Sequence, residues 1–579
     1  MFSNIIQKSS KYYYIILPII AFAIYYPIIF NDFVYCDDHD IVLVNTERID
    51  NLNNIGDEFS KGYIGTNYYR PMIYISFILN YAIGGKNPMV YQITDIALHS
   101  VAGILLFILL VRLKLPKPSS IVVAIIFIIH PLFNNAVAWI VGRNDIIWGI
   151  FSLIAFIQFI KYLDNKNIFN LFLHSLTLLL AFLSKETSLV FPGILFSYYF
   201  LIEYKKINKF EWKLISILFS SWLIPYAIYF IMKSNAELGA SVNSFGIQHI
   251  LSNWRIPVEY IAKFFMPIDL MVLSTLGILN TTLGIIFSIL GGNFIFKKAK
   301  INPLTLMGLV WFLLTTIPFL YFNLLNSNDW NEYLECRSYM PMIGVLIIIV
   351  SLVPKSVMEF KTKLSKTILI LIFIFFISIN INESIKYKNS ITFYESLTED
   401  DPSKALFHFM LSRIYRSKGQ YDKEEKSLLN SYKANNTYSK YPYSLGAFYF
   451  KNRQFSKAIF YFKETLKLSD DYDKIYFALG QSYFATGETN IAYKYLEIEF
   501  DKSGYEKELV YMLISSYLMN NKFDEAEPLL IEAQKRNDLQ ADIAESLEYV
   551  YMKLKNEDDT TAMIRLKDFR KYINLEIRR

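Results

Sequence analysis

The stretch MFSNIIQKSSKYYYIILPIIAFAIYYPIIF (1–30) decides the class of this chain. Two lysines, Lys8 and Lys11, precede a long apolar run. About 20 consecutive apolar residues suffice for a helix to cross the hydrocarbon core of a bilayer. No small-residue cleavage site follows the run, so the pattern predicts an uncleaved signal anchor.

Similar apolar runs recur over the first two-thirds of the chain. Apolar residues make up 53% of the 579 positions, which is high for a soluble protein of this size. The runs predict about eleven spans, at 13–30, 89–110, 119–136, 145–161, 168–183, 188–204, 213–232, 273–296, 304–323, 339–354 and 366–382. Two further stretches, 72–84 and 256–270, fit a re-entrant or interfacial helix as well as a span.

The basic residues indicate how these spans are oriented. Lysine and arginine gather in alternate connections, at 112–117, 205–213, 297–300 and 355–366. Such connections face the cytoplasm. An odd number of spans then places the N-terminus inside and everything after residue 382 outside. The sequence therefore predicts an integral protein of a plasma membrane.

The C-terminal third carries an internal repeat. Residues 403–538 divide into four units of 34 residues, the tetratricopeptide (TPR) period. The positions in phase are Tyr415, Tyr449, Tyr483 and Tyr517, with Ala458, Ala492 and Ala526 where two helices approach closely. The predicted fold is all-α: a transmembrane helical bundle (1–382), a linker (383–402), a four-repeat solenoid (403–538) and terminal capping helices (539–579).

TPR solenoids present a concave surface that commonly binds a peptide or protein. A structural lid or spacer on the membrane part is the alternative. The net charge of +6 is explained by membrane topology, so no nucleic-acid partner is expected. The two cysteines, Cys36 and Cys336, exclude a disulfide framework and a zinc cluster. Both lie on the predicted outer side, where a single disulfide is one alternative and two separate thiols the other.

Polar and ionisable residues gather at the predicted outer side of the membrane part. Such residues near a membrane are costly and indicate function by default. They are Asp37 and Asp38 after the first span, Arg70, His99, His130, Arg143 and Asp145, Lys185 and Glu186, and Glu335 and Arg337. In the inner connections, basic residues of the anchoring kind predominate.

This collection fits the transfer of a sugar from a phosphate to a hydroxyl group. A base must take the proton of the acceptor hydroxyl, and Asp37 or Asp38 is the candidate. Cations must stabilise the leaving phosphate, and Arg143, Lys185, Arg337 and Arg70 are the candidates. The adjacent carboxylates Asp37 and Asp38 can instead hold a divalent cation, Mg²⁺ or Mn²⁺.

Each candidate has a structural alternative. The acidic loop can be a solvated turn, and Arg143 and Lys185 can be anchors paired locally with Asp145 and Glu186. His99 fits helix packing better than function, and His130 can simply mark a helix end before Pro131. Glu335 and Arg337 are two residues apart, so on a helix they point to different faces and bind different partners.

The order of these motifs resembles a known family. An acidic pair after the first span, Tyr69-Arg70-Pro71, His130-Pro131, Gly142-Arg143, Ser184-Lys185-Glu186, a Glu335-x-Arg337-x-Tyr339-x-Pro341 stretch and a trailing TPR array are similar to those of the transmembrane and TPR repeat-containing proteins. That family consists of protein O-mannosyltransferase-like members of the C-type (GT-C) glycosyltransferases. The resemblance covers nearly the whole chain. Relative to the eukaryotic members of that family this chain is short, with four repeats, so the resemblance implies a bacterial or archaeal relative.

The resemblance implies a GT-C-like bundle with its active site at the outer leaflet. The donor would be a polyprenyl-phosphate sugar, the acceptor a Ser or Thr hydroxyl of a protein held by the repeats, and the catalytic acid Asp37 or Asp38. The family often has His-Pro-x-His-Thr-Glu, whereas this chain has Phe133, Asn134 and Asn135 at the last three positions. These departures leave the sugar, the acceptor and activity itself open.

Two other functions compete with the transferase. A non-catalytic membrane-anchored TPR scaffold or assembly factor would make the outer polar cluster dispensable. A transporter or flippase for a lipid-linked precursor would place ionisable residues at mid-membrane or on both sides.

Overall fold

The computed structural model describes residues 12–63, 66–204, 211–239, 246–298, 302–321, 333–352 and 363–536, together with residues 550, 563, 564 and 567. These residues form helices, turns and one isolated β-bridge, so the predicted all-α class is confirmed for the described part. The chain divides into two compact units, residues 1–401 and 402–579. The predicted capping helices (539–579) lie almost entirely outside the described residues.

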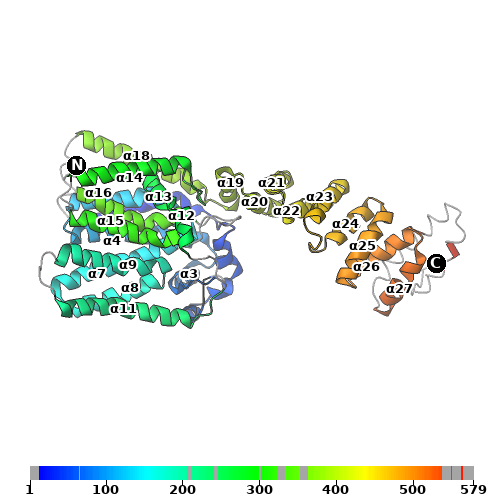
Figure 1. Ribbon diagram of the computed structural model, residues 1–579, viewed down its shortest axis with the longest axis horizontal. Helices are drawn as coiled ribbons and strands as arrows, with labels where there is room; N and C mark the ends of the chain where they lie inside the picture. Colours follow the sequence, from blue (N-terminus) through cyan, green and yellow to red (C-terminus); the bar gives the residue numbers. More distant parts are fainter. Residues whose placement is uncertain are drawn as a thin grey trace. The chain divides into compact units, whose positions relative to one another are not determined.

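The first unit is a bundle of long apolar helices that lie alongside one another (Figure 1). Its helices are α2 (Tyr13–Tyr25), α3 (Pro71–Gly84), α4 (Pro88–Arg112), α5 (Lys117–Ile129), α6 (Asn134–Ala138), α7 (Arg143–Asn165), α8 (Ile168–Phe182), α9 (Phe191–Tyr198), α11 (Trp212–Ser234), α12 (Ile250–Asn253), α13 (Arg255–Phe265), α14 (Ile278–Lys298), α15 (Pro303–Tyr321), α16 (Tyr339–Leu352), α18 (Lys363–Ile385) and α19 (Ser390–Asp400).

Eight helices within the described residues are long and apolar enough to cross a membrane, or nine if the bent pair 117–129 and 131–138 is one span. Besides this bent pair, which corresponds to the predicted span 119–136, two of the eleven predicted spans do not meet this length criterion as continuous helices. One is α8, which has 15 residues. The other, 188–204, is divided among a 3₁₀ turn (Glu186–Val190), α9 and a π-helical turn (Tyr199–Glu203).

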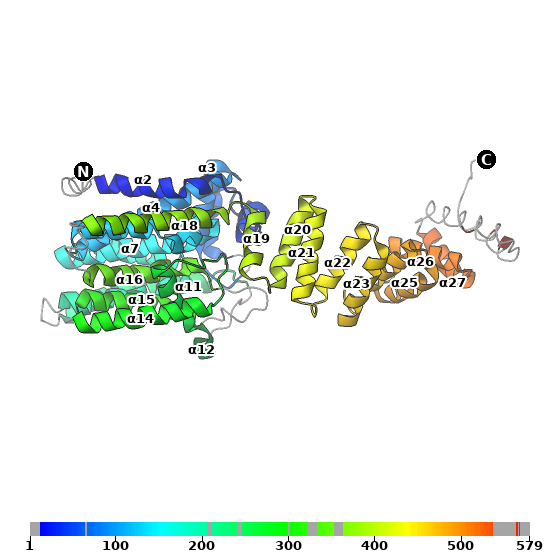
Figure 2. The same ribbon diagram turned by 90° about the horizontal axis from the view of Figure 1, so that it is seen from above.

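The two stretches that the sequence left open are short helices. α3 has 14 residues and α13 has 11, and neither is among the helices long enough to span a membrane. The predicted linker, 383–402, contains the end of α18 and all of α19. α19 belongs to the first unit and lies at one end of the bundle (Figure 2).

The described part of the second unit, residues 402–536, contains four helix pairs. They are α20 (Ala405–Ser417) with α21 (Tyr421–Ala434), α22 (Lys440–Lys451) with α23 (Phe455–Leu468), α24 (Ile475–Ala485) with α25 (Thr489–Ser503), and α26 (Lys507–Met519) with α27 (Phe523–Lys535). Each second helix begins 34 residues after the previous one. The in-phase tyrosines and alanines are buried. The predicted TPR solenoid is therefore confirmed.

Small residues allow the helices of a pair to touch in both units. A side chain at Gly480 would meet Leu496 of the partner helix, which is why the repeat keeps glycine there. In the bundle, a Cβ at Gly344 would lie 2.5 Å from the backbone oxygen of Gly308, so α15 and α16 are in backbone contact. Close approach of this kind is how apolar helices gain packing energy in a membrane.

Substitution of Gly344 by alanine should destabilise the bundle by about 1–3 kcal/mol, because the obstructing atom is backbone and the helices must separate. The measurement is the thermal unfolding of the purified protein in detergent. Gly291→Ala is the matched control, since no atom lies within 4 Å of a Cβ there. Equal effects of the two substitutions would contradict the contact.

Candidate functional site

The acidic loop follows the first span. α2 continues into a 3₁₀ turn (Tyr26–Phe30). After a turn at Tyr35 and Cys36, Asp37 and Asp38 lead into a π-helical turn (His39–Val44). Asp38 is buried, and its Oδ2 accepts a hydrogen bond of 3.3 Å from the amide of Val34. Its Oδ1 receives no well-aligned hydrogen bond, although the indole of Trp139 lies beside the carboxyl.

This environment makes Asp38 a better base than an ordinary aspartate. Burial, the largest cause, raises its pKa to about 8, and the charge of Asp37 adds to the increase, whereas the Val34 amide opposes it. A base works best when its pKa lies near the working pH. Asp37 is partly exposed and Asp38 is not, so the two carboxyls of the pair have different environments.

Tyr63 connects the acidic loop to the first cation. The charge of Asp37 raises the pKa of Tyr63, after the larger effect of burial, and the charge of Arg70 lowers it. The guanidinium of Arg70 lies 5.1 Å from the centre of the Tyr63 ring. Asn144 donates a long hydrogen bond of 3.5 Å to the Tyr63 hydroxyl. The acidic loop, the residues around Tyr63, the start of α3 and the start of α7 therefore meet at one place.

The charged residues pair across the fold and not with their sequence neighbours. Arg70 Nε lies 2.9 Å from Glu186 Oε2, and the amide of Tyr69 donates to the same carboxylate at 2.8 Å. The ammonium group of Lys185 lies 2.7 Å from each oxygen of Asp145. The local pairs Arg143–Asp145 and Lys185–Glu186, the alternative from the sequence, are wrong, because side chains from other helices supply the partners.

Three cations share one electrostatic environment. Burial lowers the pKa of Lys185, the charge of Asp145 opposes this, and the positive charges of Arg70 and Arg337 lower it further. Arg337 lies on the 3₁₀ turn Glu335–Ser338, with its guanidinium 5.8 Å from the centre of the Phe319 ring. Arg70, Lys185 and Arg337 thus form a cationic cluster, balanced in part by the two carboxylates Asp145 and Glu186.

Arg143 lies in a different environment from the cationic cluster. Its side chain is 0% exposed, and its Nε lies 2.8 Å from Asp95 of α4. The Arg143 guanidinium donates hydrogen bonds to the Asn80 side chain at 2.6 Å and to the Tyr91 carbonyl at 3.2 Å. It also lies 4.5 Å from the centre of the Phe77 ring. Apart from Arg143, no described residue gives a hydrogen bond to the Asp95 carboxylate.

Asp95 and Asn80 were not predicted from the sequence. Both lie within apolar helices, α4 and α3, and both are fully or almost fully buried. An aspartate in the middle of a predicted span was the available signal, because such a residue needs a partner. Gly142, directly before Arg143, allows this turn to form, since a Cβ there would lie 2.6 Å from the Asn135 oxygen.

The two histidines predicted as site residues, His99 and His130, both make hydrogen bonds in the interior of the bundle. His99 pairs with the Tyr339 hydroxyl at 2.8 Å and with the Ile128 carbonyl at 3.1 Å. His130 contacts the Phe264 carbonyl at 2.8 Å through Nε2, and its Nδ1 accepts from the Leu132 amide at 3.2 Å. With both ring nitrogens used, each histidine joins helices. Packing is the role that the sequence favours for His99, whereas His130 does more than end a helix before Pro131, because it also contacts α13.

Glu335 and Arg337 have different partners, as their spacing predicts. Glu335 Oε1 lies 2.7 Å from the ammonium group of Lys263 on α13, and it accepts hydrogen bonds from Ser274 and from the Met271 amide, each at 3.0 Å. Cys36 and Cys336 are both free thiols.

A cation site at Asp37 and Asp38 stays a prediction. Within the described residues, no three or more His, Cys, Asp or Glu side chains gather in an arrangement that could hold a metal ion.

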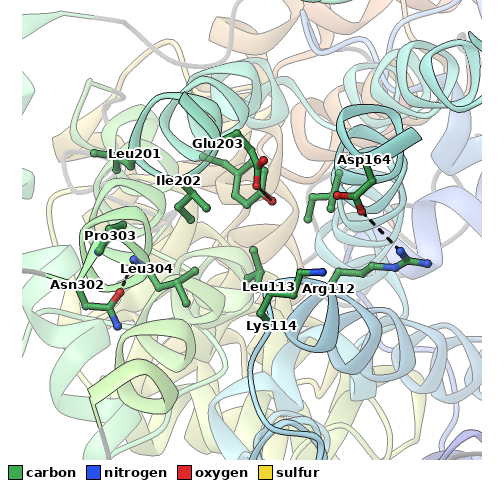
Figure 3. Close-up of a pocket in the computed structure, with 12 residues that line it drawn as sticks. Arg112, Leu113, Lys114, Asp164, Leu201, Ile202, Glu203, Asn302, Pro303 and Leu304 are labelled. Atoms are coloured by element: carbon green, nitrogen blue, oxygen red, sulfur yellow. Dashed lines mark hydrogen bonds and ion pairs between the residues drawn. The ribbon is translucent and has the colours of Figure 1, made fainter. Parts of the chain in front are cut away.

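A pocket of about 380 Å³ lies at the other end of the bundle, where α4 and α7 finish (Figure 3). Its charged lining residues are Arg112, Lys114, Asp164 and Glu203, and Arg112 and Asp164 form an ion pair of 3.9 Å. None of the predicted site residues lines this pocket. They lie instead around the acidic loop and the start of α7.

Comparison with known proteins finds relatives of the family that the motifs resemble. The chain is 31% identical over 179 residues to the protein O-mannosyl-transferase Tmtc1 of Drosophila melanogaster, which is 29% of this chain and 20% of that protein. It is 29% identical over 191 residues to TMTC3 of Mus musculus, 31% of this chain and 20% of the relative. The resemblance to the transmembrane and TPR repeat-containing proteins is confirmed.

The match covers only about a fifth of the length of these relatives. No family model matches the chain. Among solved structures, it is similar over 31% of its length to YrrB, described as a TPR protein with an unusual peptide-binding site, at 12% identity and a TM-score of 0.27; 92% of that chain is covered.

Arg143→Met should destabilise the protein by about 3–5 kcal/mol, because it leaves the buried Asp95 carboxylate without its partner. The double variant Arg143→Met with Asp95→Leu should recover most of this loss, since an apolar pair replaces the ion pair. Thermal unfolding of the single and double variants measures the coupling. If Arg143→Met keeps full stability yet loses anionic lipid, Arg143 is a ligand-binding residue, as the sequence predicts.

Proposed function

We propose that this protein is an integral-membrane glycosyltransferase. It transfers a sugar from a polyprenyl-phosphate donor to a Ser or Thr hydroxyl of a protein, as an O-mannosyltransferase-like enzyme. The observation that carries the proposal is one site that combines a buried aspartate of raised pKa with a cationic cluster. The relatives named protein O-mannosyl-transferases support it.

The acidic pair and the cationic cluster have separate roles in this mechanism. Asp38, or its neighbour Asp37, takes the proton of the acceptor hydroxyl as that oxygen attacks the sugar carbon. The bond from that carbon to the phosphate oxygen breaks, and the lipid phosphate leaves with an additional negative charge. Arg70, Lys185 and Arg337 stabilise this charge, and arginine is suited to bidentate contacts with phosphate oxygens.

Arg70 and Lys185 are already neutralised by Glu186 and Asp145. These carboxylates hold the cations in place when the donor is absent, so little reorganisation is needed when the phosphate arrives. Arg143 serves the same site indirectly, because its ion pair with Asp95 fixes the start of α7, which carries Asn144 and Asp145.

The amphipathic helix α13 and the short helix α3 would border the groove for the lipid chain. The N-terminus would be cytoplasmic, and the active site and the repeats would lie on the outer side, in keeping with the basic inner connections. The repeats would bind the acceptor protein. The competing function, a non-catalytic TPR scaffold, requires none of the charged cluster.

Donor binding is the first test. We expect polyprenyl phosphate to co-purify with the protein and to be detected by mass spectrometry, and Arg337→Ala to lose most of it. Arg112→Ala is the matched control, because Arg112 is an arginine at the other end of the bundle. If no variant carries lipid and added polyprenyl-phosphate sugars do not bind, the scaffold function is the better explanation.

Catalysis should depend on pH through Asp38. Only the carboxylate accepts a proton, so kcat/KM for transfer to a Ser or Thr peptide should rise as pH increases through about 8. Asp38→Asn should reduce turnover by about 100-fold or more while lipid still co-purifies. An unchanged rate in both Asp38→Asn and Asp37→Asn would exclude this mechanism.

A further inference from the structure

The backbone of the acidic loop is tied to the segment that ends the first unit. The amide of Asp32 donates to the Lys388 carbonyl at 2.9 Å. The amide of Tyr35 donates to Ser390 Oγ at 2.8 Å, and the Tyr394 hydroxyl donates to the Tyr35 carbonyl at 2.8 Å. Both backbone groups of Tyr35, two residues before Asp37, are therefore held by side chains of α19.

The position of α19 is fixed by an N-terminal cap and by packing. Asn389 caps its first turn by accepting from the amides of Ile391 and Thr392, and Thr392 Oγ1 accepts in return from the Asn389 amide. Such a reciprocal cap fixes where a helix begins. Phe393 and Tyr394 are fully buried, so the helix is anchored by packing as well.

The same helix contacts the other side of the catalytic carboxyl. The Phe393 ring lies 6.2 Å from that of Trp139, and Trp139 is beside Asp38. The Val34 amide, one residue before Tyr35, donates to the Asp38 carboxylate. A shift of Tyr35 would therefore move the Val34 amide, which donates the hydrogen bond to Asp38. A shift of α19 would move both Tyr35 and Trp139.

We propose that Ser390 and Tyr394 are positioning residues for the acidic pair. By fixing the amide and the carbonyl of Tyr35, they hold the loop in the turn that encloses Asp38 and presents Asp37. This inference rests on the proposed function for its catalytic consequence, but the clamp itself can be tested without any transfer assay. Neither residue touches the predicted cationic cluster through a contact described above, so donor binding is expected to be independent of them.

Cys36 is a built-in reporter of the loop. It lies between Tyr35 and Asp37, and burial together with the charges of Asp37 and Asp38 raises the pKa of its thiol well above the usual value, which slows its reaction. The second cysteine, Cys336, is buried elsewhere and provides an internal reference. Cys36 is already partly exposed, so loosening the loop should expose it further and speed its labelling, and should leave Cys336 unchanged.

The experiment measures maleimide labelling of the two thiols in the full-length protein, resolved by peptide mass spectrometry. Tyr394→Phe and Ser390→Ala should each label Cys36 about fivefold faster than wild type, the factor that corresponds to one lost hydrogen bond of about 1 kcal/mol. Ser390→Thr keeps the acceptor oxygen and should restore the wild-type rate. Tyr438→Phe, at an exposed tyrosine of the repeat unit, is the control for tyrosine substitution.

Wild-type labelling of Cys36 in both Tyr394→Phe and Ser390→Ala would overturn the proposal. If Tyr394→Phe fails to fold, the Cys36 labelling rates of Ser390→Ala and Ser390→Thr still test the proposal, which requires the first to be faster than the second. In the transfer assay, kcat should fall in Ser390→Ala with the donor KM unchanged. If Cys36 is labelled faster in the variants but the wild-type protein transfers no sugar, the positioning role stands and the proposed function is rejected. Failure of the positioning role and failure of the proposed function are therefore distinguishable.

Discussion

The architecture of the membrane unit depends on one constraint: a charged side chain inside an apolar bundle must have a partner. Among the described residues, three ion pairs in which both side chains are buried satisfy it at the end that carries the candidate site, Asp95–Arg143, Asp145–Lys185 and Glu335–Lys263. Each pair joins segments far apart in the sequence. Because removing one member would leave a buried charge, these pairs fix which helices meet, and the turn Gly142–Asp145 is where two of them start.

The sequence predicted the features that depend on local or periodic patterns. The four repeats, the apolar helices and the gathering of polar residues around one end follow from spacing and composition. The partners of the charged residues could not be predicted, because Arg70 and Glu186 are separated by more than a hundred positions and their meeting depends on how the start of α3 contacts the residues that follow α8. The length of α8 and the division of 188–204 were missed for a related reason: hydropathy measures apolar content, whereas helix continuity depends on backbone turns such as that before Phe191-Pro192.

The predicted site residues separate into two groups once their surroundings are known. Asp37, Asp38, Arg70, Lys185 and Arg337 lie in one connected region, with Glu186 and Asp145 as counter-charges. His99, His130, Glu335 and Arg143 instead use their polar atoms to join helices. Motif order alone does not make this distinction, because a residue that positions a site and one that binds a ligand are subject to similar sequence constraints.

The two units also differ in how a local change spreads. In the repeats, each helix pair packs mainly on its neighbours, so a substitution such as one at Gly480 affects adjacent pairs. In the bundle, Asp38 depends on Val34, Val34 on the turn at Tyr35, and Tyr35 on Ser390 and Tyr394 more than 350 positions away. A buried carboxyl that keeps a high pKa needs a rigid enclosure, and in this protein the enclosure is closed by the last helix of the first unit.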